Sequence, residues 1–359
     1  MLTFLIAFCS SLIATFLLIR YGHIHQHLSG DHDLNSPQKF HSKIVSRVGG
    51  IAIALGVCCS SLYVMLKDGN SELIIPLLIA CVPVFGIGIT EDLLKRVGVR
   101  KRLLFTACGA LIAVIFIPAT ISTLNIPGLD KLLALTAISI VFTCFAITGL
   151  ANGYNIIDGF HGLSSMVAII TLGAILYLAF KLNDLVLFKL TLCMLAAVMG
   201  FFIWNYPRGL IFLGDGGAYL IGFWIAILSI LLVERHNSVS PWFALAINIY
   251  PIFETLFSIY RRLIHQQKNP GDADGIHFHT LIFRRIINKS SETTLSKDGL
   301  NAKTAPYIWI LVSMNAIPVI LFFDSTIALQ ILVVLFSFTY LYLYRSIVLF
   351  KTPKWFRLD

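Results

Sequence analysis

The segment ANGYNIIDGFHGL, residues 151–163, places polar side chains at a regular spacing between two long apolar runs. Asn152, Asn155, Asp158 and His161 recur every three residues, so on a helix each is the surface neighbour of the next. Any one of them is explained by capping of a helix end, where a side chain satisfies backbone N–H groups. Four at one period favour a catalytic or binding site.

A second candidate is the pair Glu91 and Asp92, which ends an apolar run directly before a strongly basic loop. Adjacent carboxylates repel each other unless a cation or a proton lies between them, so the pair indicates a divalent metal or a proton-accepting role. The alternative is that the two acids form ion pairs with Lys95 and Arg96, one helical turn further on. These residues alone favour neither interpretation.

A third candidate is Asp215, which lies between glycines in FLGDGGAYLIGF at the start of another apolar run. This carboxylate could be a helix N-cap. Gly214, Gly216 and Gly217 leave room around it and expose backbone N–H groups, which suits a metal-bound phosphate at a helix N-terminus. Phe212, three residues earlier, is either interfacial packing or a platform on which a base stacks.

The fourth candidate lies at the head of the longest polar segment, the predicted loop 261–304. His277 and His279 are two positions apart, so their side chains share one side only if the segment is extended or irregular. A zinc site is weakly supported, because no other histidine or cysteine has a suitable spacing with them. The clustered histidines and arginines instead indicate a clamp for a diphosphate.

These candidates sit in a chain whose composition indicates an integral membrane protein: 57% of the residues are hydrophobic, 13% are charged and the mean hydropathy is +0.85. Eleven runs are long enough to cross the bilayer as helices, and they are apolar on all sides, which excludes a β-barrel. The predicted fold is therefore all-α, with one membrane domain over residues 1–359. The predicted spans are residues 1–19, 48–66, 73–90, 103–123, 132–151, 162–180, 184–203, 212–233, 241–260, 305–323 and 327–349.

Lysine and arginine are concentrated in the segments that follow the odd-numbered spans, and such basic segments remain in the cytoplasm. We therefore expect the N-terminus outside, the C-terminus in the cytoplasm, and all four polar clusters on the cytoplasmic side. The net charge of +9 is explained by basic loops beside anionic headgroups and requires no nucleic acid.

Five blocks now occur in order and on one predicted side: KFHSKIVSRVGG, TEDLLKR, NGYNIIDGFHGL, FLGDGG and PIFETLFSIYRRL with DGIHFHTLIFRR. In these blocks the chain resembles the polyprenyl-phosphate N-acetylhexosamine-1-phosphate transferases, the membrane family that includes the MraY and WecA types. The resemblance implies a multi-pass enzyme of the bacterial inner membrane with a cytoplasmic active site. It also implies transfer of a sugar 1-phosphate from a UDP-N-acetylhexosamine to undecaprenyl phosphate, with release of UMP and with Mg²⁺, or Mn²⁺, as the metal.

The resemblance also implies roles for the residues that match its motifs. Asp215 matches a ligand of the metal that bridges the diphosphate, and Glu91 and Asp92 match an acidic pair that handles the lipid phosphate and its proton. Asp158 matches a residue of the nucleotide and metal pocket that is expected to take part in catalysis. The residues that the resemblance assigns to nucleotide and phosphate binding are Lys43, Arg47, Asn152, Asn155, His161, Phe212, His277 and His279.

Three positions depart from the family pattern. Glu91 replaces an aspartate, which leaves open which acid of the pair acts on the lipid phosphate. His161 replaces the second aspartate of a DGxDGL pattern, so uracil recognition there would use an imidazole. Thr280 stands where a third histidine often lies, which favours the WecA type and a simple UDP-N-acetylhexosamine that initiates a surface glycan such as O antigen. Direct attack by the lipid phosphate is favoured over a covalent intermediate, and a homodimer is one option for the oligomeric state.

The competing class is a polytopic transporter of a small anionic solute, because polar residues in membrane helices often mark a translocation path. A transporter predicts charges at mid-membrane depth and repeated halves. Here the polar clusters lie at one membrane face, no internal repeat is found, and Glu254 and Lys189 are the main ionisable groups within spans. An active site at the membrane surface fits better.

Overall fold

The computed structural model describes residues 1–31, 44–269, 271, 274–288, 297–353 and 356. Regular structure in these residues is helical, apart from an isolated antiparallel bridge between Gly30 and Ser46. The all-α prediction is therefore confirmed. Lys43, which was expected near the nucleotide, lies outside the described residues.

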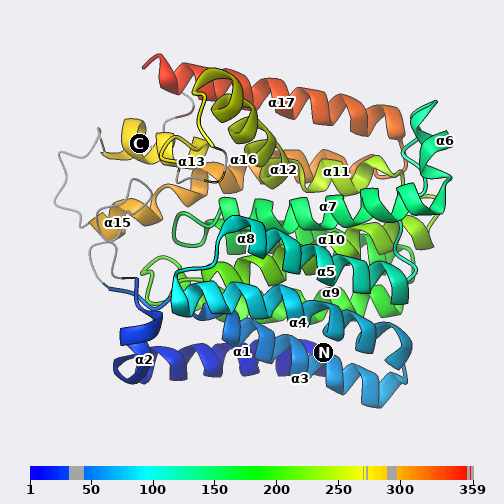
Figure 1. The fold of residues 1–359 in the computed structure, drawn as a ribbon, viewed down its shortest axis with the longest axis horizontal. Helices are drawn as coiled ribbons and strands as arrows, with labels where there is room; N and C mark the ends of the chain where they lie inside the picture. Colours follow the sequence, from blue (N-terminus) through cyan, green and yellow to red (C-terminus); the bar gives the residue numbers. More distant parts are fainter. Residues whose placement is uncertain (32–43, 270, 272–273, 289–296, 354–355, 357–359) are drawn as a thin grey trace.

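Ten long helices account for most of the described chain (Figure 1). They are α1 (Leu2–Arg20), α3 (Gly49–Asp68), α4 (Ser71–Leu94), α5 (Val99–Phe116), α7 (Thr136–Ile156), α8 (Leu163–Lys181), α9 (Leu185–Asn205), α10 (Gly214–Arg235), α16 (Ala305–Leu321) and α17 (Thr326–Val348). The shorter elements are α2 (Gly22–Ser29), α6 (Leu129–Leu133), α11 (Trp242–Ile247), α12 (Ile249–Tyr260), α13 (Phe278–Ile282), α15 (Lys297–Ala302) and the π-helical turns η1 (Arg261–His265) and η2 (Phe283–Ile287).

Within the described ranges, nine helices are long and apolar enough to cross a membrane, so the predicted count of eleven is not confirmed. The span predicted at 103–123 ends early, at Phe116, because Pro118 disfavours helical geometry in the residue before it. The span predicted at 241–260 is divided at Asn248 into α11 and α12. Pro251 explains this break, since proline has no N–H for the carbonyl four residues earlier.

Helix α10 forms the centre of the bundle. Of its 18-residue membrane-spanning stretch, 94% is buried, and it packs against α3, α4, α7 and α8 among others. Its sequence is apolar all round, which is what a helix surrounded by other helices requires. Asp215, in the first turn of this helix, is thereby placed at the middle of one end of the bundle.

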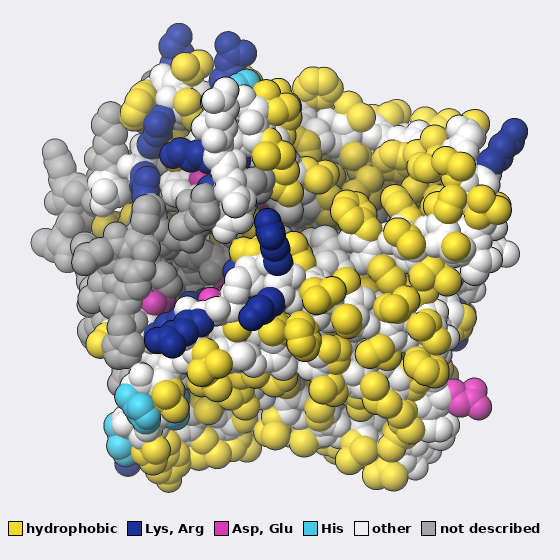
Figure 2. All heavy atoms as spheres, viewed as in Figure 1, with side chains coloured by type: hydrophobic (Ala, Val, Ile, Leu, Met, Phe, Trp, Pro, Cys, Tyr) yellow, Lys and Arg dark blue, Asp and Glu magenta, His cyan; other side chains and the backbone are white. Residues whose placement is uncertain are grey.

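The segments that carry the polar motifs lie at the same end of the bundle, on the left in Figure 1. Each motif segment joins the end of one antiparallel helix to the start of the next, so alternate connections share an end. Lysine and arginine side chains gather at this end in Figure 2. Which side of the membrane it faces stays a prediction.

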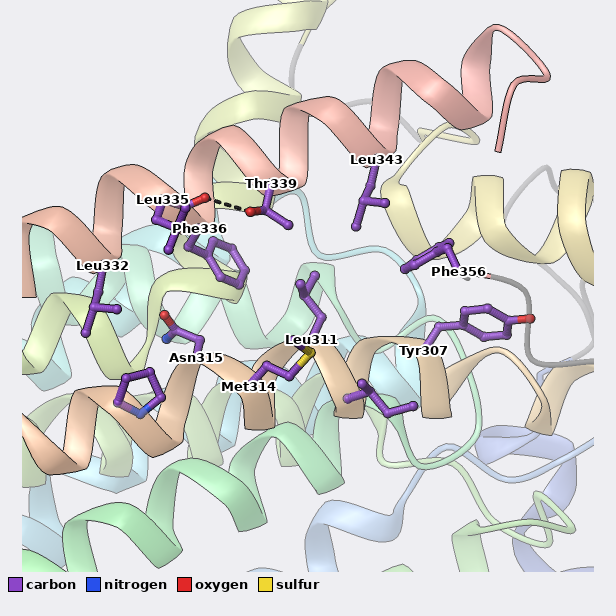
Figure 3. Close-up of a pocket in the computed structure, with 12 residues that line it drawn as sticks. Tyr307, Leu311, Met314, Asn315, Leu332, Leu335, Phe336, Thr339, Leu343 and Phe356 are labelled. Carbon is purple, nitrogen blue, oxygen red and sulfur yellow. Dashed lines mark hydrogen bonds between the residues drawn. The ribbon is translucent and has the colours of Figure 1, made fainter. Parts of the chain in front are cut away.

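A pocket of about 380 Å³ lies between α16 and α17 (Figure 3). Leu311, Met314 and Phe336 are typical of its apolar lining. Two of its polar side chains already donate to backbone carbonyls: Asn315 to Ala246 at 2.8 Å and Thr339 to Leu335 at 2.8 Å. The pocket contains no residue of the four polar clusters, which lie at the end of the bundle.

Candidate active site

The site is built around the carboxylate of Asp215, of which only 5% of the residue surface is exposed. Its Oδ1 accepts a hydrogen bond from Arg47 Nη2 at 2.8 Å, and its Oδ2 accepts one from Arg102 Nη1. Gly214 precedes it with a φ of +76°, and a Cβ there would lie 1.9 Å from the carbonyl oxygen of Arg47. Glycine is therefore required where the chain turns into α10.

Asp92 reaches the same place from the end of α4 and is fully buried. It accepts hydrogen bonds from the backbone N–H groups of Asp215, at 2.8 Å, and Gly216, at 2.9 Å, and its Oδ1 lies 3.6 Å from Arg47 Nη2. The carboxylate thus caps α10 and lies against the positive end of the helix dipole. The sequence predicted that these N–H groups face a phosphate, whereas in the structure Asp92 occupies two of them.

Glu91 points away from its neighbour, because successive residues on a helix lie about 100° apart. Its Oε2 accepts a hydrogen bond from the backbone N–H of Val97 at 2.6 Å. Lys95 instead donates to the carbonyl of Gly30, and neither acid forms an ion pair with Lys95 or Arg96, all four being described residues. The alternative of a surface ion-pair cluster is therefore wrong, and the two acids have different surroundings.

Backbone contacts between glycines bring three helices together at Asp215. A Cβ on Gly50 of α3 would lie 2.3 Å from the nitrogen of Gly217, and one on Gly88 of α4 would lie 2.6 Å from the Cα of Gly216. Such contacts are too short for any side chain. The glycines therefore let α3 and α4 reach the first turn of α10, which places Asp92 beside Asp215.

Arg47 is carried by an extended segment that pairs with the chain before α10. Phe212 donates its N–H to Ser46 O at 2.8 Å and accepts one from Gly49 at 3.0 Å. Burial opposes the charge of Arg47, but Asp215, Asp92 and further carboxylates, Asp158 among them, raise its pKa above the ordinary value. The guanidinium stays charged and is a permanent anion-binding group.

The 151–163 segment is only partly helical. Helix α7 ends at Ile156, so Asn152 and Asn155 lie on its last turns, whereas Asp158 and His161 lie in the turn that follows. The single helical stripe predicted for the four residues is therefore wrong. Asn152 Oδ1 accepts a hydrogen bond from Tyr219 of α10 at 3.1 Å, which holds the end of α7 against the Asp215 helix.

His161 is 3% exposed and packs against Phe212, with ring centroids 5.6 Å apart and a tilt of 35°. A Cβ on Gly209 would lie 2.3 Å from the imidazole, and the His161 backbone N–H donates to Asn301 Oδ1 at 2.9 Å. The structure therefore places His161 and Phe212, the two residues predicted to contact uracil, against each other. Their role in nucleotide binding stays a prediction.

The histidine segment is held by buried groups of α12 and α17. His277 Nδ1 donates to Glu254 Oε1 at 2.9 Å, and Tyr340 donates to Glu254 Oε2 at 2.8 Å. His279 Nδ1 lies 3.3 Å from the hydroxyl of Tyr250. The two imidazoles stack 5.3 Å apart, which confirms that this piece brings them to one side.

His279 also contacts the 151–163 segment. A Cβ on Gly159 would lie 3.1 Å from His279 Nε2, and the ring of Phe160 meets the imidazole edge to face at 5.6 Å. Both histidines are largely buried, at 7% for His277 and 2% for His279. In this structure His279 supports the turn that carries Asp158, and His277 stacks against His279.

Sequence reasoning did not assign two residues of this region to the site. In the sequence, Arg102 belongs to a basic run before an apolar span and indicates only topology. Glu254 is an ionisable residue within a predicted span, and a carboxylate in such a position is itself a signal of a buried polar network. Neither has a partner near it in sequence, so only the packing identifies their roles.

The residues fit Mg²⁺ as a metal shared between protein and substrate. Mg²⁺ is usually held by one or two carboxylates together with phosphate oxygens and water. Asp215 provides such a carboxylate, and Arg47 and Arg102 are groups that can move from it to phosphate oxygens. Among the described residues no three His, Cys, Asp or Glu side chains converge as a metal cage. The bound phosphates would have to complete the coordination.

A profile of the family Glycosyl transferase family 4 matches residues 73–233, which include Asp92, Asp158 and Asp215. The phospho-N-acetylmuramoyl-pentapeptide-transferase of Lactobacillus johnsonii is 30% identical over 292 residues, which are 77% of this chain and 89% of that protein. The chain belongs to glycosyl transferase family 4. Two other relatives in this family transfer a different sugar phosphate, according to their names.

The probable undecaprenyl-phosphate N-acetylglucosaminyl 1-phosphate transferase of Bacillus subtilis is 28% identical over 258 residues, 70% of each chain. The undecaprenyl-phosphate alpha-N-acetylglucosaminyl 1-phosphate transferase of Thermotoga maritima is 28% identical over 254 residues, 71% of this chain and 73% of that one. The family resemblance is therefore confirmed, and the protein is a multi-pass bacterial membrane transferase.

Proposed function

We propose that this protein transfers an N-acetylhexosamine 1-phosphate from a UDP-sugar to undecaprenyl phosphate and releases UMP. The observation that carries the proposal is the placement of Asp215. Its carboxylate is buried at the N-terminus of the central helix, beside Asp92, and two arginines hold both of its oxygens. This arrangement suits the exchange of a protein ion pair for a metal and a diphosphate.

In the proposed reaction an oxygen of the lipid phosphate attacks the β-phosphorus of the UDP-sugar. A new P–O bond forms there, the bond from the β-phosphorus to the bridging oxygen breaks, and UMP leaves with the electron pair. Arg47 and Arg102 neutralise the diphosphate and orient it for in-line attack. Bound Mg²⁺, held by Asp215, would polarise the phosphate oxygens and stabilise the charge that develops on them.

A strong base is unnecessary in this scheme, because a lipid phosphate is largely ionised at neutral pH. Both oxygens of Asp92 accept backbone hydrogen bonds, so in the described state this acid shapes the site rather than removing a proton. Asp158 is one of the carboxylates that raise the pKa of Arg47, and we assign it a part in positioning the diphosphate.

The test uses purified protein in detergent, with UDP-N-acetylglucosamine, UDP-N-acetylgalactosamine and the peptide-bearing UDP-muramoyl donor offered separately. We expect UMP release with a simple hexosamine donor only when undecaprenyl phosphate and Mg²⁺, or Mn²⁺, are both present. Turnover of the peptide-bearing donor alone would contradict the proposed donor class and the proposed start of a surface glycan. UMP released in one burst without undecaprenyl phosphate would indicate a covalent intermediate.

We further propose an inner-membrane location with the active end in the cytoplasm, which the basic side chains at that end support. Reporter fusions after Asp359 and before Met1 should report a cytoplasmic C-terminus and an external N-terminus. Solute uptake into proteoliposomes without UMP release would instead favour the transporter.

A further inference from the structure

Helix α2 begins two residues after the membrane-spanning helix α1 ends, so it lies at the boundary of the bilayer. Figure 1 shows it at the end of α1, turned away from the direction of the long helices. Tyr21 and, on α2, Ile24 and Leu28 are 52%, 62% and 52% exposed. Ile24 and Leu28 are four residues apart on α2 and therefore share one face of that helix. Together with Tyr21, in the turn between α1 and α2, they form the apolar stripe of this helix.

The residues that flank this stripe indicate which part of the membrane lies against it. The stripe follows directly after α1, a candidate membrane span with exposed apolar side chains such as Leu17, and it is flanked by Arg20 and by the exposed His23 and His27. Histidine side chains are visible at this corner in Figure 2. Tyrosine and basic residues beside an apolar helix face are typical of the headgroup layer, where the apolar face enters the edge of the acyl region.

A second face of α2, about 100° around the helix from the stripe, is hydrogen-bonded to the segment that carries Arg47. His25 Nε2 lies 3.0 Å from the Leu18 carbonyl, which can only accept, so this nitrogen carries the hydrogen. His25 Nδ1 lies 2.7 Å from the hydroxyl of Ser29, which also donates to the carbonyl of His25 at 3.1 Å, and the hydroxyls of Ser29 and Ser46 are 2.8 Å apart. The residue after Ser46 is Arg47.

Backbone contacts complete the connection. Arg47 donates its N–H to Ser29 O at 3.0 Å, and Asp31 donates to Val45 O at 2.9 Å. The end of α2 therefore pairs with residues 45–47 on one side, while Phe212 pairs with Ser46 on the other. The backbone of Arg47 is fixed between α2 and the chain leading to Asp215.

We propose that α2 binds the phospholipid headgroup layer through Tyr21, Ile24 and Leu28, and that Ser29 and Ser46 transmit its position to Arg47. Ser29 and Ser46 are positioning residues, because they act on the diphosphate only through Arg47. The lipid contact stands on the structure alone, whereas the effect on the diphosphate rests on the proposed function. A UDP-sugar site would then have its correct shape only with α2 seated on the membrane.

The lipid contact is tested by replacing Ile24 with the photo-crosslinking residue benzoylphenylalanine, in nanodiscs of phosphatidylethanolamine and phosphatidylglycerol. We expect phospholipid adducts by mass spectrometry, as at the control position Phe338, which is 67% exposed on α17. Cross-linked dimers would show that a second copy covers the stripe. An absence of adducts at Ile24, with adducts at Phe338, would show that the stripe faces water; either result overturns the proposal.

The positioning role is tested with Ser46→Ala and the matched Ser46→Thr, which keeps the hydroxyl on a partly exposed, extended residue. Ser46→Ala should raise the KM for the UDP-sugar severalfold with a smaller change in kcat, and Ser46→Thr should restore it. In an Arg47→Lys background, Ser46→Ala should raise the KM little further, because both substitutions act through the guanidinium of Arg47.

Additive effects in this pair, or a lower Tm with an unchanged KM, would contradict the positioning role. In nanodiscs, Ile24→Asn should raise the same KM, and an unchanged KM would separate the lipid contact from the site. If the wild-type protein releases no UMP from any donor, the proposed function fails, while the cross-linking experiment still decides the lipid contact.

Discussion

Asp92 accepts a hydrogen bond at 2.8 Å from the backbone N–H of Asp215, a residue 123 positions later in the chain. One acid therefore caps the helix that presents the other. The two neighbouring carboxylates are tolerated because Arg47 contacts both of them and the N-terminus of α10 adds positive potential. Asp92 therefore shapes the first turn of α10, whereas Asp215 is the acid that can exchange its two arginine partners for a metal.

Asp92→Asn should damage the protein more than Glu91→Gln. The asparagine amide keeps one oxygen, so one of two buried N–H groups loses its acceptor, at a cost of about 1–3 kcal/mol in unfolding free energy. The chemical step should fall as well, because the first turn of α10 shifts. Thermal unfolding and single-turnover UMP release measure the two effects; equal losses in both variants would contradict this assignment.

Gly88→Ala should destabilise the protein by about 1–3 kcal/mol, because its Cβ would meet the backbone of Gly216. The matched control is Gly86→Ala on the same helix, where a Cβ meets nothing within 4 Å. That variant should be neutral or more stable by about 0.5–1 kcal/mol, since alanine favours the helix. Tm values in one detergent compare the pair, and similar losses would refute the close approach of α4 and α10.

Asp215→Asn should keep the fold and reduce turnover by about 100-fold or more, because the amide is nearly isosteric but is a weak ligand for a hard cation. The Tm of the wild-type protein with UMP present should rise on addition of Mg²⁺, and that rise should be absent in the variant. Recovery of turnover at excess Mg²⁺ would reduce the role of Asp215 to weak metal binding.

His161→Ala should raise the KM for the UDP-sugar more than it lowers kcat, as expected when ground-state binding is lost. The structure adds a second effect, because the buried imidazole supports Phe212, and its loss should cost about 1–3 kcal/mol of stability. Calorimetric titration with UMP tests the binding part. An unchanged UMP affinity together with a lower Tm would make His161 a packing residue only.

Acid should destabilise the protein partly through His279. Burial lowers the pKa of His279 from 6.5 to about 3 in the folded protein, with Glu254 and Asp274 opposing the shift and His277 adding to it. Its contribution is present above pH 6.5 and is lost as the pH falls toward 3, because the unfolded chain binds the proton. His279→Gln should therefore show a smaller fall in Tm between pH 7 and 4.5 than the wild type.

The control for the pH series is His23→Gln, which changes an exposed histidine on α2. Its Tm should follow the wild-type pH dependence. If His279→Gln and wild-type proteins lose stability in parallel, the buried imidazole is not a source of the acid sensitivity.

The positions of the membrane helices follow from local sequence, because a run of about 20 apolar residues crosses hydrocarbon wherever it occurs. Nine of the predicted spans are therefore matched by suitable helices in the described chain, while Pro118 and Pro251 interrupt the remaining two. Local pattern also identified Asp215 and the Glu91–Asp92 pair as unusual, since carboxylates beside apolar runs are costly. It could not show that Asp92 accepts hydrogen bonds from the first turn of α10 while Glu91 accepts one from the backbone of Val97.

Local hydropathy specifies the helices and their alternation, and hence the common end at which the polar motifs meet. The contacts of Arg102 with Asp215, of Glu254 with His277 and of Asp92 with the first turn of α10 arise from packing between distant parts of the chain. Hydropathy and periodicity describe each helix by itself. Contacts between residues far apart in the chain depend on how closely two backbones approach each other. Glycines such as Gly50 and Gly88 permit this approach, and the local sequence does not show which helix each glycine contacts.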